Sequence, residues 1–295
     1  MMDRRTLILC GGAALAAGCS MLAGERAPAA EMQRERFEAI RATLGPGARI
    51  GVAAIDTASG RRLLHDAGSR YAMASTFKLP LAAMVLAEVE PGRLRLDEEL
   101  PFAPDDPLDN SPVVAANIFR GRLDVGTLAA SVVQVSDNSA ANALLRRLGG
   151  PSGLTRFIRS VGDPVTRLDR FEMELGTNIS GDPRDTTTPA AMAELVRTLA
   201  LGGRLSARSR AQLADWLTTS VPGPDRLRAG LPAGWRWGHK TGTAANGGVN
   251  DVGIAWPPGR SPIVIASYQD GGDAPTPVRA AAHAAVARLV AATIG

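Results

Sequence analysis

The hydrophobic pattern of the chain changes twice, from short strand-like runs to long helical segments and back again. Residues 49–56 alternate as a strand does, and 61–65 is predicted to be the hairpin partner of that strand across the polar turn at 57–60. Near the end of the chain the pattern predicts three more strands, at 235–243, 249–256 and 262–269. We expect the strands to pair in an antiparallel sheet.

Between the two groups of strands, apolar residues recur at helical spacing. This part of the chain predicts helices at 75–88, 125–135, 138–148, 151–161, 189–201 and 206–217. One amphipathic helix is expected before the first strand, at 31–44, and another after the last strand, at 278–293. Proline and glycine concentrate at 101–112 and 221–234, which we interpret as loops.

The order of these elements predicts an α+β fold with two lobes. We expect an antiparallel sheet flanked by the terminal helices, with an all-helical lobe inserted between its strands. The α/β lobe would combine 30–73 with 219–295, and the helical lobe would occupy 74–218. Within the helical lobe, 168–186 is compact but has little periodicity, which indicates a packed Ω-loop.

The first 29 residues are interpreted as an export signal rather than as part of the fold. Arg4 and Arg5 precede an apolar run at 7–17 that has the length of a signal-peptide core. The paired arginines suggest the twin-arginine route, with an ordinary export signal as the alternative. Cys19 follows a sequence similar to a lipoprotein box, but its leucine lies one residue too far upstream, so lipid anchoring is less favoured. We expect a periplasmic or secreted protein.

Composition excludes several classes of partner. The chain is 45% hydrophobic and 21% charged, which is globular, and its net charge of +4 is scattered along the sequence. Because aromatic residues make up only 4%, we do not expect nucleic acid to bind by a basic stripe with stacked rings. Three histidines and two cysteines stand at spacings that cannot build a usual zinc site, so no metal is expected.

Lysine is rare in this chain, because all but two of the 33 basic residues are arginines. Lysine can lose its proton when it is desolvated, whereas arginine stays charged and cannot act as a base. Lys78 stands three residues after Ser75, so the two side chains share one face of a predicted helix. We interpret Ser75 as a candidate nucleophile and Lys78 as its candidate base, although Ser-x-x-Lys alone also fits an ordinary helix start.

A second candidate motif, Ser136-Asp137-Asn138, lies between two predicted helices. Ser136 is suited to relay a proton, and Asn138 is suited to hydrogen-bond a substrate amide and the nearby lysine. The alternative is a turn or a helix N-cap without catalytic function.

The third motif, Lys240-Thr241-Gly242-Thr243, lies on a predicted strand. Lys240 would supply positive charge for a substrate carboxylate, and Thr241 and Thr243 would add hydroxyl contacts. Gly242 would let a ligand approach the backbone. The alternative is a polar edge strand.

The predicted Ω-loop contains the fourth group of candidates. We expect Arg170 and Asp185 to pair across its neck, and Glu172 to hold a buried water molecule. The alternative is that Glu172 is a solvated loop charge.

These motifs, in this order, are the signature of class A β-lactamases and penicillin-binding proteins. From about residue 31 to its end, the chain resembles a class A serine β-lactamase. The likeness includes the loop with Glu172, the exit segment 184–189 and the pair Asn250-Asp251.

This resemblance implies hydrolysis of penicillins and cephalosporins, and hence antibiotic resistance. Ser75 would form the acyl-enzyme, and water activated by Glu172 would hydrolyse it. Ser136 would pass a proton to the leaving nitrogen, and backbone N–H groups of Ser75 and Thr243 would form the oxyanion hole. Whether Lys78 or Glu172 takes the serine proton stays open. The resemblance implies a monomer that binds a small β-lactam and needs neither metal nor cofactor.

Two departures from the family pattern concern the water and the carboxylate. Four residues after Glu172 the family often has an asparagine that shares the hydrolytic water, and this chain has Gly176. We therefore expect some acyl-enzymes to turn over slowly. Many members have an arginine where this chain has Val249, and Arg226 stands where others carry a substitute. We assign Arg226 to carboxylate binding, with a surface arginine as the alternative.

A further departure is that Ala74 and Ala244 replace the cysteines that some carbapenem-hydrolysing members join, so no such disulfide exists. The aromatic residue that commonly guards the cleft is also not found near Asn110. His239, beside Lys240, is expected on the surface of its strand rather than in the cleft.

Three other functions compete with this interpretation. A transpeptidase shares the serine and lysine chemistry but lacks a deacylating glutamate, so Glu172 argues against it. A sensor that stays acylated is favoured only by Gly176. A Ser-His-Asp esterase is excluded because the chain has no Gly-x-Ser-x-Gly motif.

Overall fold

The computed structural model describes residues 26–102 and 109–295. The predicted export signal lies outside the described residues up to position 25. Helix α2 (Arg26–Ala42) forms the whole described part of a first unit that ends at Ala39, and its last three residues belong to the second unit. It begins earlier than predicted, within the segment assigned to the signal, because a proline in the first turn is compatible with a helix.

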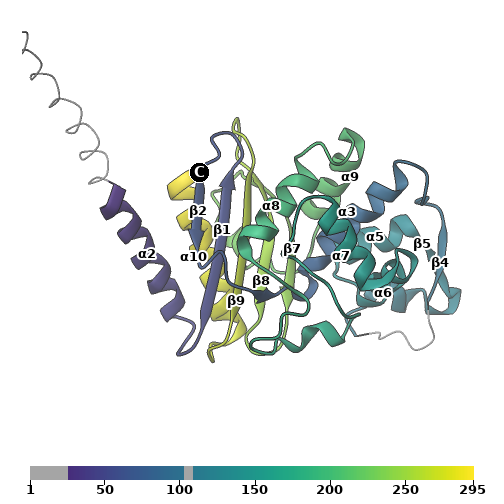
Figure 1. Ribbon diagram of the computed structural model, residues 1–295, viewed down its shortest axis with the longest axis horizontal. Coiled ribbons are helices and arrows are strands. Elements are labelled where there is room, and N and C mark those ends of the chain that lie inside the picture. The colour runs from purple at the N-terminus through teal and green to yellow at the C-terminus, as the bar shows by residue number, and fades with distance from the viewer. Residues whose placement is uncertain (1–25, 103–108) are drawn as a thin grey trace, which may run out of the picture. The chain divides into compact units, whose positions relative to one another are not determined.

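The second unit is built on a five-stranded antiparallel sheet with the order β2-β1-β9-β8-β7. Figure 1 shows that this sheet combines both ends of the colour scale, because strands from the start of the chain lie beside strands from its end. Its strands are β1 (Arg49–Asp56), β2 (Arg62–His65), β7 (Arg236–Thr243), β8 (Val249–Trp256) and β9 (Ile263–Asp270). Every strand predicted for this sheet is confirmed, with ends that differ by at most one residue.

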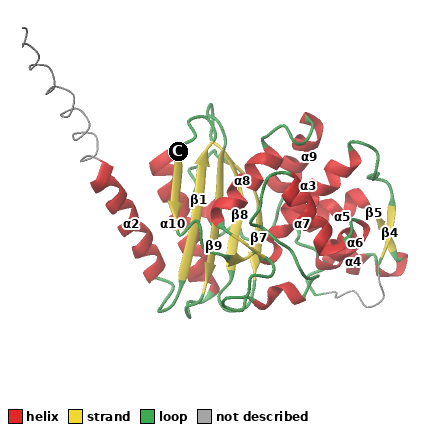
Figure 2. Ribbon diagram, in the orientation of Figure 1, coloured by secondary structure: helices red, strands yellow, loops and turns green. Residues whose placement is uncertain are grey.

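Helices cover both faces of the sheet (Figure 2). Strands β8 and β9 are buried at every position but their last, which requires a layer on each side. Helix α10 (Thr276–Ile294) packs against β1, β8 and β9. Helix α8 (Pro189–Ala200) packs against the same three strands, and α9 (Ala207–Thr218) packs against β7.

Helix α3 (Lys78–Val89) is the centre of the helical lobe. It is apolar on all sides and buried from Lys78 to Leu86, as a helix surrounded by others must be. Around it pack α8, α9 and three further helices, α5 (Val125–Gln134), α6 (Asn138–Arg147) and α7 (Gly150–Ser160). These helices confirm the predicted ones, except that a 3₁₀ turn, η1 (Ala74–Phe77), precedes α3.

The helical lobe is not wholly helical, which corrects the prediction. It contains a short hairpin of β4 (Glu99–Pro101) and β5 (Arg122–Asp124), and β6 (Thr186–Thr187), which pairs with β3 (Tyr71–Ala72). Strands of two or three residues are too short to produce a periodic pattern. The remaining short elements are α4 (Pro112–Ala116), η2 (Ile118–Arg120), η3 (Glu174–Thr177) and η4 (Leu227–Gly230). The division into lobes at 73/74 and 218/219 stays a prediction.

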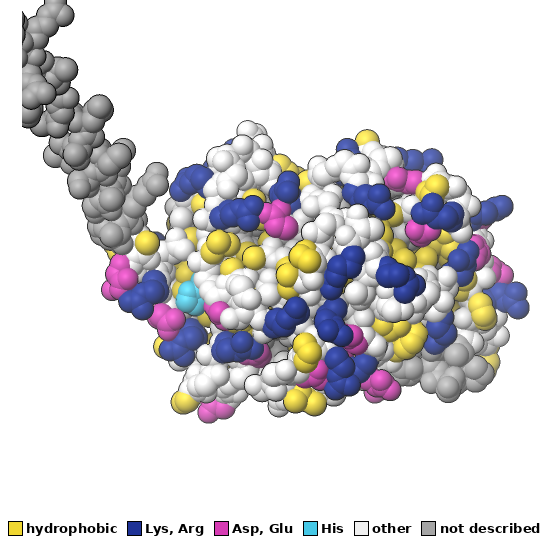
Figure 3. All heavy atoms as spheres, viewed as in Figure 1, with side chains coloured by type: hydrophobic (Ala, Val, Ile, Leu, Met, Phe, Trp, Pro, Cys, Tyr) yellow, Lys and Arg dark blue, Asp and Glu magenta, His cyan; other side chains and the backbone are white. Residues whose placement is uncertain are grey.

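The surface agrees with a scattered charge. On the face seen in Figure 3, basic side chains are spread over much of the surface with acidic side chains among them. None of the helices in the described part of the chain has the length and apolarity needed to cross a bilayer.

Candidate active site

The four motifs that lie far apart in the sequence meet at one place. The ammonium of Lys78 lies 3.1 Å from Ser75 Oγ and 2.9 Å from Glu172 Oε1. Ser136 Oγ lies 3.4 Å from Lys78 Nζ and 3.0 Å from Lys240 Nζ. Polar groups from four separate segments therefore come together: η1 with the start of α3, the segment before α6, the Ω-loop and the edge strand β7.

Lys78 is completely buried and fully engaged in hydrogen bonds. Its ammonium donates to the Ser136 carbonyl at 2.9 Å and also to Asn138 Oδ1. Burial lowers the pKa of Lys78 below its usual range, and the Glu172 carboxylate opposes part of that shift. A lysine with a lowered pKa can exchange a proton with a neighbouring hydroxyl.

The backbone is strained at two positions of this site. Ala74, directly before the nucleophile candidate, has φ +44°, and Ser136 has φ +62°. Non-glycine residues rarely adopt such angles, and strained backbones concentrate at functional sites. Asn250 on β8 holds the segment before Ser75, because its amide donates to the carbonyls of Ala72 at 2.9 Å and Met73 at 3.2 Å.

Gly242 lets strand β7 pack closely against the turn η1. A Cβ at this position would lie 2.7 Å from the Met73 carbonyl oxygen and 3.2 Å from Ala74 Cβ. The missing side chain therefore lets β7 approach the turn that carries Ser75, and the approach of a ligand to this backbone stays a prediction. This contact fixes the distance between the nucleophile candidate and the end of β7.

The Ω-loop is closed at its neck by the predicted pair. Arg170 Nε donates to Asp185 Oδ2 at 2.6 Å, and Asp185 Oδ1 accepts the backbone N–H groups of Asp169 and Arg170. Glu172 is 8% exposed, so it is not a solvated loop charge. Its backbone is held by Asn142, which accepts from Glu172 N and donates to Glu172 O, each at 3.0 Å.

The end of β7 gathers positive charge beside hydroxyl groups. Lys240 is completely buried and donates to the Thr241 carbonyl at 2.7 Å. Burial, with the nearby charge of Lys78, holds the pKa of Lys240 well below its usual range. Arg226 is 9% exposed and donates to Thr243 Oγ1 at 2.9 Å, so it is not a surface arginine. A carboxylate placed here would meet two cations and the exposed hydroxyl of Thr243.

His239 is buried, which corrects the expectation that it lies on the strand surface. It is 2% exposed, and its Nδ1 lies 2.7 Å from Asp251 Oδ1. Gly253 opposite makes the room, because a Cβ there would lie 2.8 Å from His239 Cβ. Asp251 also accepts from Leu227 N at 3.1 Å, which fixes the segment next to Arg226.

Three polar residues of the site were given no role from the sequence. Asn142 lies one helical turn after Asn138 on α6, a spacing that could have indicated a shared face. Asp137 caps α6 and accepts from Val113 N and Val114 N through its second oxygen. Asn110 donates to the Ser136 carbonyl at 2.9 Å, a contact across the lobe that the sequence does not signal. Among the described residues no cluster of acidic, histidine or cysteine side chains could hold a metal ion.

Comparison with known proteins agrees with this geometry. Residues 34–294 match the model of the β-lactamase enzyme family. The β-lactamase AST-1 of Nocardia asteroides is 46% identical over 231 residues, which cover 78% of this chain and 74% of that protein. The carbapenem-hydrolyzing β-lactamase KPC of Klebsiella oxytoca is 43% identical over 250 residues, covering 84% and 85% respectively.

A solved structure gives the same result for the fold. The class A β-lactamase of the last common ancestor of Gram-negative bacteria (GNCA4) superposes with a TM-score of 0.86 at 49% identity, covering 89% of this chain and 99% of that one. The chain belongs to the family of class A serine β-lactamases, hydrolases that open the β-lactam amide and confer antibiotic resistance. The predicted α+β fold, family and enzyme class are thereby confirmed.

Proposed function

We propose that Ser75 attacks the β-lactam carbonyl of penicillins and cephalosporins, and that water activated by Glu172 hydrolyses the resulting acyl-enzyme. One observation carries the assignment: Lys78 Nζ lies within 3.1 Å of Ser75 Oγ and 2.9 Å of Glu172 Oε1. A nucleophile and a base within hydrogen-bond reach are what acyl transfer requires.

Acylation forms the bond from Ser75 Oγ to the carbonyl carbon and breaks the bond from that carbon to the ring nitrogen. The serine proton can go to Lys78 at 3.1 Å or to Glu172 Oε1 at 3.4 Å, so either group is in reach as the base. Ser136 Oγ, between Lys78 and Lys240, is placed to deliver a proton to the leaving nitrogen. The backbone N–H groups of Ser75 and Thr243 are assigned to the oxyanion.

Substrate binding is assigned to the end of β7 and to α6. Lys240, Thr241, Thr243 and Arg226 would hold the carboxylate, and Asn138 the substrate amide. A bound carboxylate favours the charged form of Lys240, so binding offsets the effect of burial on its pKa. Loss of carboxylate-dependent affinity in Arg226→Ala, with the fold retained, is the outcome that this assignment requires.

The decisive experiment is burst kinetics with a penicillin, a cephalosporin and a carbapenem on wild type and Glu172→Ala. We expect the wild type to turn over and the variant to release one burst and stop. A wild type that stalls after one burst would indicate an acylated sensor instead. Equal steady-state turnover in both proteins would refute the assignment of Glu172.

We also propose that the chain is exported and acts as a monomer. Export to the periplasm or the medium, with penicillin catabolism there, is supported by Arg4, Arg5 and the apolar run at 7–17, which lie outside the described residues. Replacing both arginines by Lys distinguishes the twin-arginine route, since only that route needs the pair. The monomer is supported by a site assembled within one chain, and light scattering tests it.

A further inference from the structure

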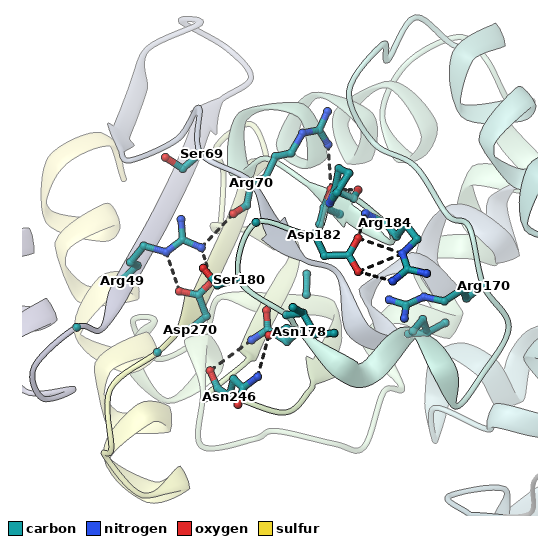
Figure 4. Close-up of a pocket in the computed structure, with 18 residues that line it drawn as sticks. Arg49, Ser69, Arg70, Arg170, Asn178, Ser180, Asp182, Arg184, Asn246 and Asp270 are labelled. Atoms are coloured by element: carbon teal, nitrogen blue, oxygen red, sulfur yellow. Dashed lines mark hydrogen bonds and ion pairs between the residues drawn. The ribbon is translucent and has the colours of Figure 1, made fainter.

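A pair of asparagines joins the Ω-loop to the turn between β7 and β8. Asn178 Nδ2 donates to the carbonyls of Ala245 at 2.9 Å and Asn246 at 3.3 Å. In return, Asn246 Nδ2 donates to the carbonyls of Asn178 at 3.0 Å and Thr177 at 3.4 Å. Figure 4 shows the two side chains facing each other. We call Asn178 and Asn246 the asparagine clasp.

The half of the clasp on the sheet is firmly anchored. The Asn246 carbonyl accepts from Gly271 N at 2.8 Å, which ties the β7–β8 turn to the end of β9. Arg279 of α10, 3% exposed, donates to the Gly247 carbonyl at 3.0 Å and to the Gly271 carbonyl at 2.6 Å. The clasp therefore attaches the loop to a rigid support.

The half of the clasp on the loop borders an open cavity. Behind the outer part of the loop lies a cavity of about 670 Å³, lined among others by Arg49, Arg70, Asn178, Arg184, Asn246 and Asp270 (Figure 4). An open cavity means that this part of the loop lacks packed neighbours on that side. Gly176 has no side chain, and the space around its Cβ position is open to 4 Å. The loop side of this stretch is held by the buried side chain of Leu175 and by Arg170, which donates to Thr177 Oγ1 at 3.2 Å. Its attachments to the β7–β8 turn are the clasp and a backbone bond from Ala245 N to Gly176 O at 3.0 Å.

Two attachments hold the loop at and after Glu172. On one side Asn142 holds its backbone, and six residues later the clasp holds Asn178. The turn at the other end of the clasp follows directly on Thr243, which ends β7. The clasp therefore spans from the loop that carries the deacylating carboxylate to the strand that ends at the oxyanion position.

We propose that Asn178 and Asn246 are positioning residues for deacylation, which set the place of Glu172 relative to the end of β7. This role rests on the proposed function of Glu172. The clasp supplies from outside the pocket the restraint that no side chain supplies at Gly176. Gly248 is part of the arrangement, because a Cβ there would lie 3.2 Å from Asn178 Nδ2. Loosening the clasp should slow hydrolysis of the acyl-enzyme and leave its formation almost unchanged. Lys78 lies on another element and stays 3.1 Å from Ser75 Oγ, so a base for acylation remains in place.

The test uses Asn178→Asp and Asn246→Asp, which keep the shape of the side chain but remove the N–H donors. Both positions have positive φ, +44° and +51°, which Asp tolerates better than Ala does. The double variant Asn178→Gly with Asn246→Gly removes both amides without backbone strain or added charge. The matched control is Asn117→Asp, which loses a similar bond, from Asn117 Nδ2 to the Val113 carbonyl at 2.9 Å, outside the loop.

Acylation and deacylation rate constants are measured separately with a penicillin in single-turnover experiments, together with the Tm. We expect each clasp variant to slow deacylation about threefold to tenfold, the equivalent of one lost neutral hydrogen bond. Acylation should change less than about twofold, and the control should match wild type in both steps. Either single substitution opens the same clasp. The glycine double variant should therefore slow deacylation by no more than the effects of the two single variants added as activation free energies.

Two results overturn the proposal. If the double variant deacylates at the wild-type rate while Glu172→Ala still stalls, the clasp has no role in deacylation, and the proposed function is unaffected. A parallel fall of both rate constants with the Tm shows that the asparagines only support the fold. If Glu172→Ala itself deacylates normally, it is the proposed function that fails.

Discussion

Lys78 and Lys240 are both completely buried, but we assign them different roles. Substitution of each by arginine distinguishes these roles. Arginine keeps a positive charge and cannot act as a base. We expect Lys78→Arg to lose about 10²- to 10⁴-fold in kcat/KM, the usual contribution of a general base. Lys240→Arg should lose far less, mainly through KM, because its role needs only charge.

Steady-state kinetics with one penicillin compare the two variants, and circular dichroism checks that both are folded. Equal losses in the two would contradict the division of roles. The pKa of Lys78, lowered by burial, is what makes a neutral amine accessible at this position.

Gly176 has no side chain at the position where the family often has an asparagine. The space around its Cβ position is open, and its φ is not in the left-handed region, so a side chain fits there. We expect Gly176→Asn to hydrolyse slow acyl-enzymes about threefold to tenfold faster, because one added hydrogen bond would hold the water. Deacylation rates for several substrates provide the measurement, with Gly176→Ala as the control. Equal rates for all substrates would show that the missing amide has no consequence.

Among the elements, the contact between β7 and the turn η1 determines the geometry of the site. Gly242→Ala would place a methyl group 2.7 Å from the Met73 carbonyl oxygen, which forces the strand and the turn apart. We expect a loss of about 1–3 kcal/mol in stability and a fall of kcat/KM of at least about tenfold. Gly176→Ala, at an open position, should change stability by less than about 0.5 kcal/mol.

Urea unfolding and kinetics on the two alanine variants provide the comparison. Full activity in Gly242→Ala would mean that the close approach of β7 and η1 is not needed for catalysis.

Strands and helices with long periodic patterns were predictable at this scale, whereas short or paired features were not. The strands of the main sheet have eight residues in β1, β7, β8 and β9, long enough to show their period. Strands β3 to β6 are far shorter and exist because of their partners. His239 looked exposed because neither its partner Asp251 nor the space left by Gly253 can be read without the register of β7 on β8.

The site was predictable for a related reason. Ser75 and Lys78 are local in the sequence, and the order of the motifs identified the family. The clasp and the hold of Asn142 on Glu172 depend on distant segments, so only the fold reveals them.

For the whole molecule, His283 makes stability depend on pH. It lies in α10, is completely buried, and bridges Val249 O on β8 and Ser267 Oγ on β9 at 3.0 and 2.9 Å. Burial lowers the pKa of His283 to about 4. The unfolded chain takes up the proton near its ordinary pKa of about 6.5, so this stability is present above that pH and is lost as the pH falls towards 4.

Urea unfolding at pH 7 and pH 4.5 measures the effect in wild type and His283→Gln. Wild type should lose about 2–3 kcal/mol more than the variant between the two pH values. Identical losses would show that another group causes the acid sensitivity.

The pairing of β1 with β9 over its full length has a consequence for biosynthesis. A ribosome that has released β1 must add some two hundred residues before the neighbouring strand exists, and until then β1 has only β2, a hairpin that is barely stable alone. A nascent chain that ends between Glu172 and Ile263 would contain Ser75, Lys78 and Glu172 but not the completed sheet that aligns them. Nonsense mutations upstream of Ile263 should therefore leave no residual antibiotic resistance. The nascent chain should stay sensitive to the host's proteases until β9 has been synthesised.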